Sequence, residues 1–196
     1  MPITGRTPAE CFSQFRDHLA GLIADTVTTK HPLTQKDDSN RTILGFRQGK
    51  LVGVPLDTRF GRLYFYLSQS LRTVQQADGQ HRLQTRQYWY RVQADPSRGK
   101  QAILRWEYDA ETDKDKHARH HMQMPAEVSI GEGVLNLDKA HLPTGWVTVE
   151  EVIRFLIVDL EIKPPCGDDW PQKLQDSETK FFHEFTGKRE PFAAKA

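Results

Sequence analysis

The chain has 196 residues, of which 37% are hydrophobic and 27% charged, and its formal net charge is +1. This much apolar material supports one hydrophobic core, so we expect a single compact domain over residues 1–196. No apolar stretch approaches the roughly 20 residues of a membrane-spanning helix, which argues against a membrane protein or a membrane partner. Because the sequence has only two cysteines and no apolar run near its start, we expect a reducing, cytoplasmic location.

The net charge conceals an asymmetry between the two halves of the chain. Residues 1–100 contain 15 Lys and Arg against 8 Asp and Glu, whereas residues 101–196 contain 12 against 18. The excess of basic residues is concentrated in residues 41–100, which hold 11 basic and 3 acidic side chains. A segment of this charge attracts a polyanion such as RNA. The alternative is that it packs against the acidic half, either within one chain or across a homo-oligomer.

The N-terminal region predicts one amphipathic helix over residues 8–26. Thr7 can cap free backbone amides, Pro8 suits the first helical position, and Glu10 can complete a capping box. Apolar residues then recur at helical spacing, at Phe12, Phe15, Leu19, Leu22 and Ile23. We expect this helix to cover a sheet, and the polar residues 31–41 to form a loop after it.

The central region predicts an antiparallel sheet over residues 42–137. Apolar and polar residues alternate from 62 to 72, as in a strand with one buried face. Asp78-Gly79 then predicts a tight turn, and further strands over 82–92 and 102–108 complete a three-stranded meander. Shorter strands are expected at 42–46 and 51–54.

The C-terminal region predicts two helices within residues 148–186. Thr148 and Glu151 have capping-box spacing at the start of the first helix. Pro164-Pro165 ends that helix, and Pro171 begins the second. The predicted fold class is therefore α+β, an antiparallel meander sheet covered by an N-terminal helix with two C-terminal helices appended.

Reactive side chains are densest where three of the eight histidines fall within five residues, at His117, His120 and His121. A helix there would put His117 and His121 on one face, whereas a strand would add Arg119 to the same side. Two imidazoles and a guanidinium can cleave RNA without a metal. One imidazole takes the 2'-hydroxyl proton, the other protonates the leaving oxygen, and arginine stabilises the phosphate charge. The candidate catalytic residues are therefore His117, His120, His121 and Arg119, with no metal or cofactor.

Two other interpretations of these histidines stay open. Short His-rich segments beside acidic residues are often solvated and inert. A metal site is the second alternative, although the chain has neither an H-E-x-x-H pattern nor paired Cys-x-x-Cys motifs. Its candidate ligands are His117, His121, His141 and Asp109.

A second candidate site is the polar aromatic face of the central hairpin. Tyrosine rings can stack on unpaired bases and guanidinium groups can hold phosphates, a combination suited to single-stranded RNA. The candidate nucleic-acid-binding residues are Arg62, Tyr64, Tyr66, Arg72, Arg82, Arg86, Tyr88, Tyr90 and Arg105. The alternative is that Arg and Tyr side chains pair across the strands, or that a helix covers this face.

Four segments follow one another between residues 61 and 123. They are Gly61-Arg-Leu-Tyr-Phe-Tyr, Tyr88-Trp-Tyr-Arg, Ile103-Leu-Arg-Trp-Glu-Tyr-Asp109 and Arg119-His-His. In this order the chain resembles the TumE-type toxin proteins of bacterial toxin–antitoxin modules. The resemblance implies a small bacterial protein that inhibits growth by acting on RNA and is neutralised by an antitoxin.

The leading functional hypothesis is a cytoplasmic, toxin-like RNA-binding protein with endoribonuclease activity at the clustered histidines. The alternative is a non-catalytic protein–protein interaction module of a toxin–antitoxin or defence system, which binds an antitoxin, another protein or a second copy of the chain. Phosphate-loop, dinucleotide-fingerprint and nucleophile-elbow motifs do not occur in the sequence.

Overall fold

The computed structural model describes residues 4–38, 41–48, 50–96, 102–112, 118–130, 133–137 and 140–185. Its helices are α1 (Pro8–Thr26), α2 (Val149–Val158), the short 3₁₀ helix η1 (Gly167–Asp169) and α3 (Trp170–Phe185). Its strands are β1 (Thr4–Gly5), β2 (Leu33–Asp38), β3 (Arg41–Gln48), β4 (Lys50–Leu51), β5 (Val54–Thr58), β6 (Gly61–Gln75), β7 (His81–Gln93), β8 (Ala102–Asp109), β9 (His120–Gln123), β10 (Glu127–Ile130), β11 (Gly133–Asn136) and β12 (Leu142–Pro143).

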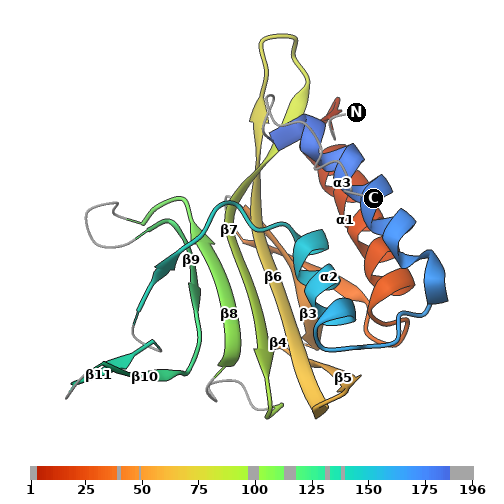
Figure 1. Ribbon diagram of the computed structural model, residues 1–196. Helices are drawn as coiled ribbons and strands as arrows, with labels where there is room; N and C mark the ends of the chain where they lie inside the picture. Colours follow the sequence, from red (N-terminus) through yellow and green to blue (C-terminus); the bar gives the residue numbers. More distant parts are fainter. Residues whose placement is uncertain are drawn as a thin grey trace.

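The strands form an antiparallel sheet that carries α1, α2 and α3 on one face (Figure 1). The order across the sheet is β12-β9-β8-β7-β6-β3-β2, and β10 pairs with β11 in a separate ribbon. The expected α+β class, with its N-terminal helix and two C-terminal helices, is confirmed. Within the described residues, no helix combines the length and the apolar content required to cross a lipid bilayer.

Local signals determine where the helices begin. Thr7 Oγ1 accepts a hydrogen bond from the Glu10 amide at 3.2 Å, and α1 spans the residues expected from the sequence. At α2, Thr148 Oγ1 accepts from the Glu151 amide at 3.1 Å, and Glu151 Oε2 accepts from the Thr148 amide at 2.8 Å. Both helices therefore start at residues whose side chains satisfy free backbone amides.

Residues 31–41 contain a strand where we expected a loop. β2 pairs antiparallel with β3 and is the last strand in the sheet order. Its polar residues Gln35, Lys36 and Asp37 are exposed. The expectation was wrong because a polar composition also suits an edge strand, which meets solvent on one side and discourages further pairing.

A β-bulge in β7 changes which residues face the helices. Ser70 of β6 pairs with Gln87, but the next residue, Leu71, pairs with Thr85, so Arg86 is an extra residue on β7. Before the bulge, Leu83 and Thr85 face the helices and the even-numbered residues of β7 point away from them. After the bulge, Tyr88 and Tyr90 face the helices and the odd-numbered residues point away. We call the face of β6 to β9 that points away from α1, α2 and α3 the outer face.

The hydrophobic core lies between the three helices and the other face of the sheet. Its fully buried members include Leu19 and Ile23 of α1, Phe65 and Leu67 of β6, and Ile153 and Leu156 of α2. The β6–β7 turn lies at the predicted Asp78-Gly79, where Gly79 has a φ of +81°, a conformation that glycine adopts without strain. The core of β6 and the turn between β6 and β7 therefore both lie where the sequence predicts them.

A chain of polar side chains runs from the surface into the contact between the three helices. The Lys180 ammonium lies 3.3 Å from His18 Nδ1, and His18 Nε2 lies 2.9 Å from Ser177 Oγ. The Ser177 hydroxyl in turn donates to Glu150, which is buried. Burial, aided by the charge of Lys180, lowers the pKa of His18 from 6.5 to about 4. Neutral His18 therefore fits this network, and its protonation opposes it.

We expect acid to weaken the fold through His18. His18 takes up a proton near pH 6.5 in the unfolded chain but only near pH 4 in the folded chain. Neutral His18 therefore makes its full contribution to the free energy of unfolding above pH 6.5, and this contribution is lost as the pH falls toward 4. Because His18 is partly exposed, we expect a loss on the order of 1 kcal/mol. Urea unfolding of wild type and His18→Gln at pH 7 and pH 4.5 measures it, with His31→Gln as control. Equal pH dependence in wild type and His18→Gln would contradict the prediction.

Candidate functional site

Polar side chains form three adjacent rows across β7, β8 and β9 on the outer face. The first row holds Gln87 and Asp109, the second holds Trp89, Glu107 and His121, and the third holds Arg91, Arg105 and Gln123. Neighbouring rows lie about 7 Å apart, because residues on one face of a strand repeat every second position. The strand register thus brings together side chains that are 14 to 32 residues apart in sequence.

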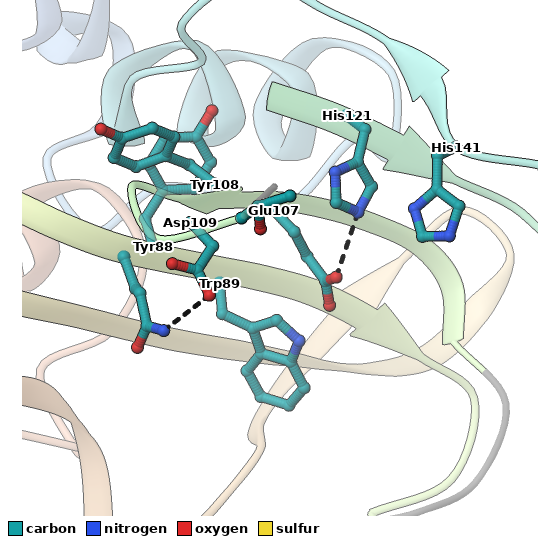
Figure 2. Close-up of a pocket in the computed structure, with 9 residues that line it drawn as sticks. Tyr88, Trp89, Glu107, Tyr108, Asp109, His121 and His141 are labelled. Carbon is teal, nitrogen blue, oxygen red and sulfur yellow. Dashed lines mark hydrogen bonds and ion pairs between the residues drawn. The ribbon is translucent and has the colours of Figure 1, made fainter. Parts of the chain in front are cut away.

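A cavity of about 410 Å³ opens on these rows (Figure 2). It is lined by Gln87, Tyr88, Trp89, Glu107, Tyr108, Asp109, Thr112, His121 and His141. Figure 2 shows the rings of Tyr88 and Tyr108 turned to the opposite side of the strands from Trp89 and Glu107. The functional groups that reach the cavity are therefore mainly carboxylates, imidazoles, an amide and one indole.

Glu107 lies at the centre of a charged cluster. Its Oε1 is 3.1 Å from Arg105 Nε, and its Oε2 is 3.3 Å from His121 Nε2. His121 is buried, and its Nδ1 lies 3.0 Å from the carbonyl oxygen of Ala118. The His121 ring thus lies between the Ala118 carbonyl on its Nδ1 side and the Glu107 carboxylate on its Nε2 side. The Arg105 guanidinium and the His121 imidazole therefore flank the Glu107 carboxylate on its two oxygens.

His141 joins this cluster from the segment before β12. The pairing of Leu142 with Met122 extends to put His141 opposite Gln123, and the two side-chain Nε2 atoms lie 3.4 Å apart. The His141 ring meets the His121 ring edge to face, with 4.5 Å between centroids. His141 is exposed whereas His121 is buried, so His141 is the imidazole that a ligand can reach.

The other end of the cavity is formed by Asp109, Gln87 and Trp89. Asp109 Oδ2 accepts a hydrogen bond from Gln87 Nε2 at 2.9 Å, and its Oδ1 accepts from the Glu111 amide at 2.8 Å. The Arg91 guanidinium carbon stacks on Trp89, 3.9 Å from the ring centroid. The Tyr66 ring also meets Trp89, with 6.3 Å between centroids and an edge-to-face angle, and Trp89 lines the cavity beside Asp109.

The clustered histidines do not converge as the catalytic hypothesis expected. His120 lies on the helix side of β9, next to His121 in sequence but on the opposite face, because neighbouring strand residues alternate. Its ring stacks on Tyr108 with 4.3 Å between centroids, and burial lowers its pKa. Arg119 is half-buried, and its Nε donates to the Thr112 carbonyl at 3.4 Å. His117 lies outside the described residues.

The predicted nucleic-acid face is corrected at Tyr88 and Tyr90. The bulge in β7 turns both rings toward the helices, where they are buried and stack with 4.8 Å between centroids. Burial raises the pKa of Tyr88 to about 12 and holds the pKa of Tyr90 well above its usual range. The strand register keeps the remaining hairpin candidates on the outer face or at the bulge, namely Arg62, Tyr64, Tyr66, Arg72, Arg82 and Arg86.

Most of the predicted arginines already have partners on the protein. Arg62 pairs with Asp57 at 3.0 Å and Arg86 pairs with Glu111 at 2.9 Å. Arg72 Nε donates to Gln84 Oε1 at 2.7 Å. Tyr66 is fully buried, and its hydroxyl donates to a backbone carbonyl. These arginines therefore pair with carboxylate and amide side chains, and not with the tyrosines that the alternative interpretation named.

Sequence reasoning missed Glu107, Trp89 and Gln87. It considered His141 as a metal ligand and left open whether His141 joins the histidine cluster. A signal was present, because Arg105, Glu107 and Asp109 alternate with apolar and aromatic residues in a predicted strand. Among the described residues, no three His, Cys, Asp or Glu side chains are placed to hold a metal ion together. No family model, curated protein or solved structure matches the chain.

Proposed function

We propose that the chain is an endoribonuclease that cleaves RNA by metal-independent general acid–base catalysis in the outer-face cavity. The observation that supports it is the Glu107 carboxylate held between Arg105 and His121, at 3.1 and 3.3 Å, beside the exposed imidazole of His141. A carboxylate and an imidazole in one cavity supply the base and the acid that phosphodiester transfer requires.

In the proposed reaction, Glu107 takes the proton of the ribose 2'-hydroxyl. The 2'-oxygen then bonds to phosphorus as the bond from phosphorus to the 5'-oxygen breaks. The departing 5'-oxygen receives a proton from the His141 imidazolium, so the products are a 2',3'-cyclic phosphate and a 5'-hydroxyl. Arg105 lies next to Glu107 and offers positive charge to the phosphate in the transition state. Buried His121 positions Glu107 and does not itself need to reach the substrate.

The biological setting that we propose follows the resemblance to TumE-type toxins. Such a protein would act in the bacterial cytoplasm, and an antitoxin that covers the cavity would neutralise it. Expression of the chain should then arrest growth, and Glu107→Gln should relieve the arrest at equal protein levels.

The decisive test is the chemistry of the product ends. Purified protein should cut single-stranded RNA in the presence of EDTA and leave 2',3'-cyclic phosphate and 5'-hydroxyl ends. A DNA strand of the same sequence should remain intact, because it lacks the 2'-hydroxyl nucleophile. Absence of cleavage, cleavage of DNA, or 5'-phosphate products would each overturn the proposal.

A non-catalytic protein-binding module is the second candidate function. It is favoured by the ion pairs of Arg62 and Arg86, which leave less free positive charge for a nucleic acid than the sequence suggests. This candidate predicts no RNA cleavage and tight binding of an antitoxin, another protein or a second copy. Size-exclusion chromatography with light scattering detects the self-association directly.

A further inference from the structure

We infer that the Asp109 end of the cavity binds guanine, so that cleavage follows guanosine in single-stranded RNA. The choice of an RNA base as ligand rests on the proposed function. The inference itself depends on three residues at this end, Gln87, Trp89 and Asp109, none of which takes part in the proposed proton transfers.

The hydrogen-bonding groups at this end have a defined order. Gln87 Nε2 has two hydrogens, of which one is donated to Asp109 Oδ2 at 2.9 Å and one remains for a ligand. Asp109 Oδ1 accepts from the Glu111 amide at 2.8 Å. Each carboxylate oxygen has a second acceptor site, so Gln87 and Asp109 together present a donor followed by two acceptors.

Only guanine complements all three of these groups. Its Watson–Crick edge has the acceptor O6, then the donor N1–H, then the donor N2–H. Adenine and cytosine can satisfy a donor and one acceptor, and uracil sets its second carbonyl against a carboxylate oxygen. Two adjacent N–H donors on a carboxylate also form the strong, charge-assisted type of bond. A site built in this way rejects bases that leave its polar groups unpaired.

Trp89 and the spacing of the rows complete the site. Trp89 lines the cavity beside Asp109, so a base bound there lies against this residue (Figure 2). Asp109 and Glu107 are alternate residues on one face of β8, about 7 Å apart. A base on Asp109 therefore puts its ribose near Glu107, which is the group proposed to take the 2'-hydroxyl proton.

Calorimetric titration of the full chain with nucleoside 3'-monophosphates tests the inference without requiring turnover. We expect 3'-GMP to bind about 10-fold or more tightly than 3'-AMP, 3'-CMP and 3'-UMP. Inosine 3'-monophosphate differs from 3'-GMP only in lacking the N2 amino group. We therefore expect the unaltered protein to bind it about 10-fold more weakly than 3'-GMP. Asp109→Asn and Gln87→Met should each remove most of the preference, and Glu111→Gln, at the rim, should keep it.

The outcomes separate this inference from the proposed function. A preference for 3'-GMP without RNA cleavage supports the guanine site and overturns the ribonuclease. RNA cleavage with equal binding of all four nucleotides, or with cuts after every base, overturns the guanine site and leaves the ribonuclease. If no nucleotide binds, the guanine site is overturned as well.

Discussion

Glu107→Gln is expected to lower the rate of RNA cleavage by about 10²- to 10⁴-fold. The amide has nearly the shape of the carboxylate but cannot take the 2'-hydroxyl proton. It also loses the charge that Arg105 and His121 hold in place at 3.1 and 3.3 Å. Single-turnover cleavage of an end-labelled RNA by wild type and variant gives the ratio of rate constants. A rate within threefold of wild type would show that Glu107 is not the base.

His141→Ala is expected to cause a loss of similar size, because the leaving oxygen then departs without a proton. If the two groups act in one step, the double variant should be little slower than either single variant. Glu111→Gln is the control for charge on the cavity rim, since Glu111 is exposed and pairs with Arg86. His31→Ala controls for loss of an imidazole outside the cavity. Fully additive losses would argue for two independent effects.

The fold follows from local signals that the sequence displays directly. Thr7 and Thr148 cap the helices where they were expected, and the alternation around Leu63 places one face of β6 in the core. The edge strand β2 was missed because its stabilisation comes from pairing with β3 and not from its own composition. Apolar periodicity thus predicts strands and helices that have one continuous buried face, such as β6. It does not predict an exposed edge strand such as β2, whose residues are mostly polar.

The site was less predictable, because it depends on which residues the register brings together. His120 and His121 are neighbours in sequence, yet β9 places them on opposite faces of the sheet. His141 lies 20 residues from His121 in sequence and reaches it only through the pairing of β12 with β9. An extra residue in β7 likewise turned Tyr88 inward. A cluster of reactive residues in a sequence is therefore a weak guide to a cluster in space when the segment is extended.

Ile153→Ala is expected to lower the free energy of unfolding by about 2–5 kcal/mol. Ile153 is fully buried on α2, so truncation removes apolar contacts and leaves a cavity between the helix and the sheet. Val158→Ala is the matched control, because Val158 lies in the same helix but is 54% exposed, and it should change stability by about 0.5 kcal/mol or less. Urea unfolding followed by circular dichroism measures both, and equal losses would contradict the placement of the core.

The same variant tests whether the two faces of the sheet act independently. The core lies on the helix side, whereas Glu107 and Asp109 project from the outer face of β8. Folded Ile153→Ala should therefore cleave RNA at close to the wild-type rate at low temperature, although it unfolds more easily. Glu107→Gln should show the reverse, with cleavage lost and the fold retained, because the amide has nearly the shape of the carboxylate and still offers an acceptor oxygen beside Arg105. If Ile153→Ala instead loses cleavage while still folded, the helices must hold the strands in the register that assembles the cavity.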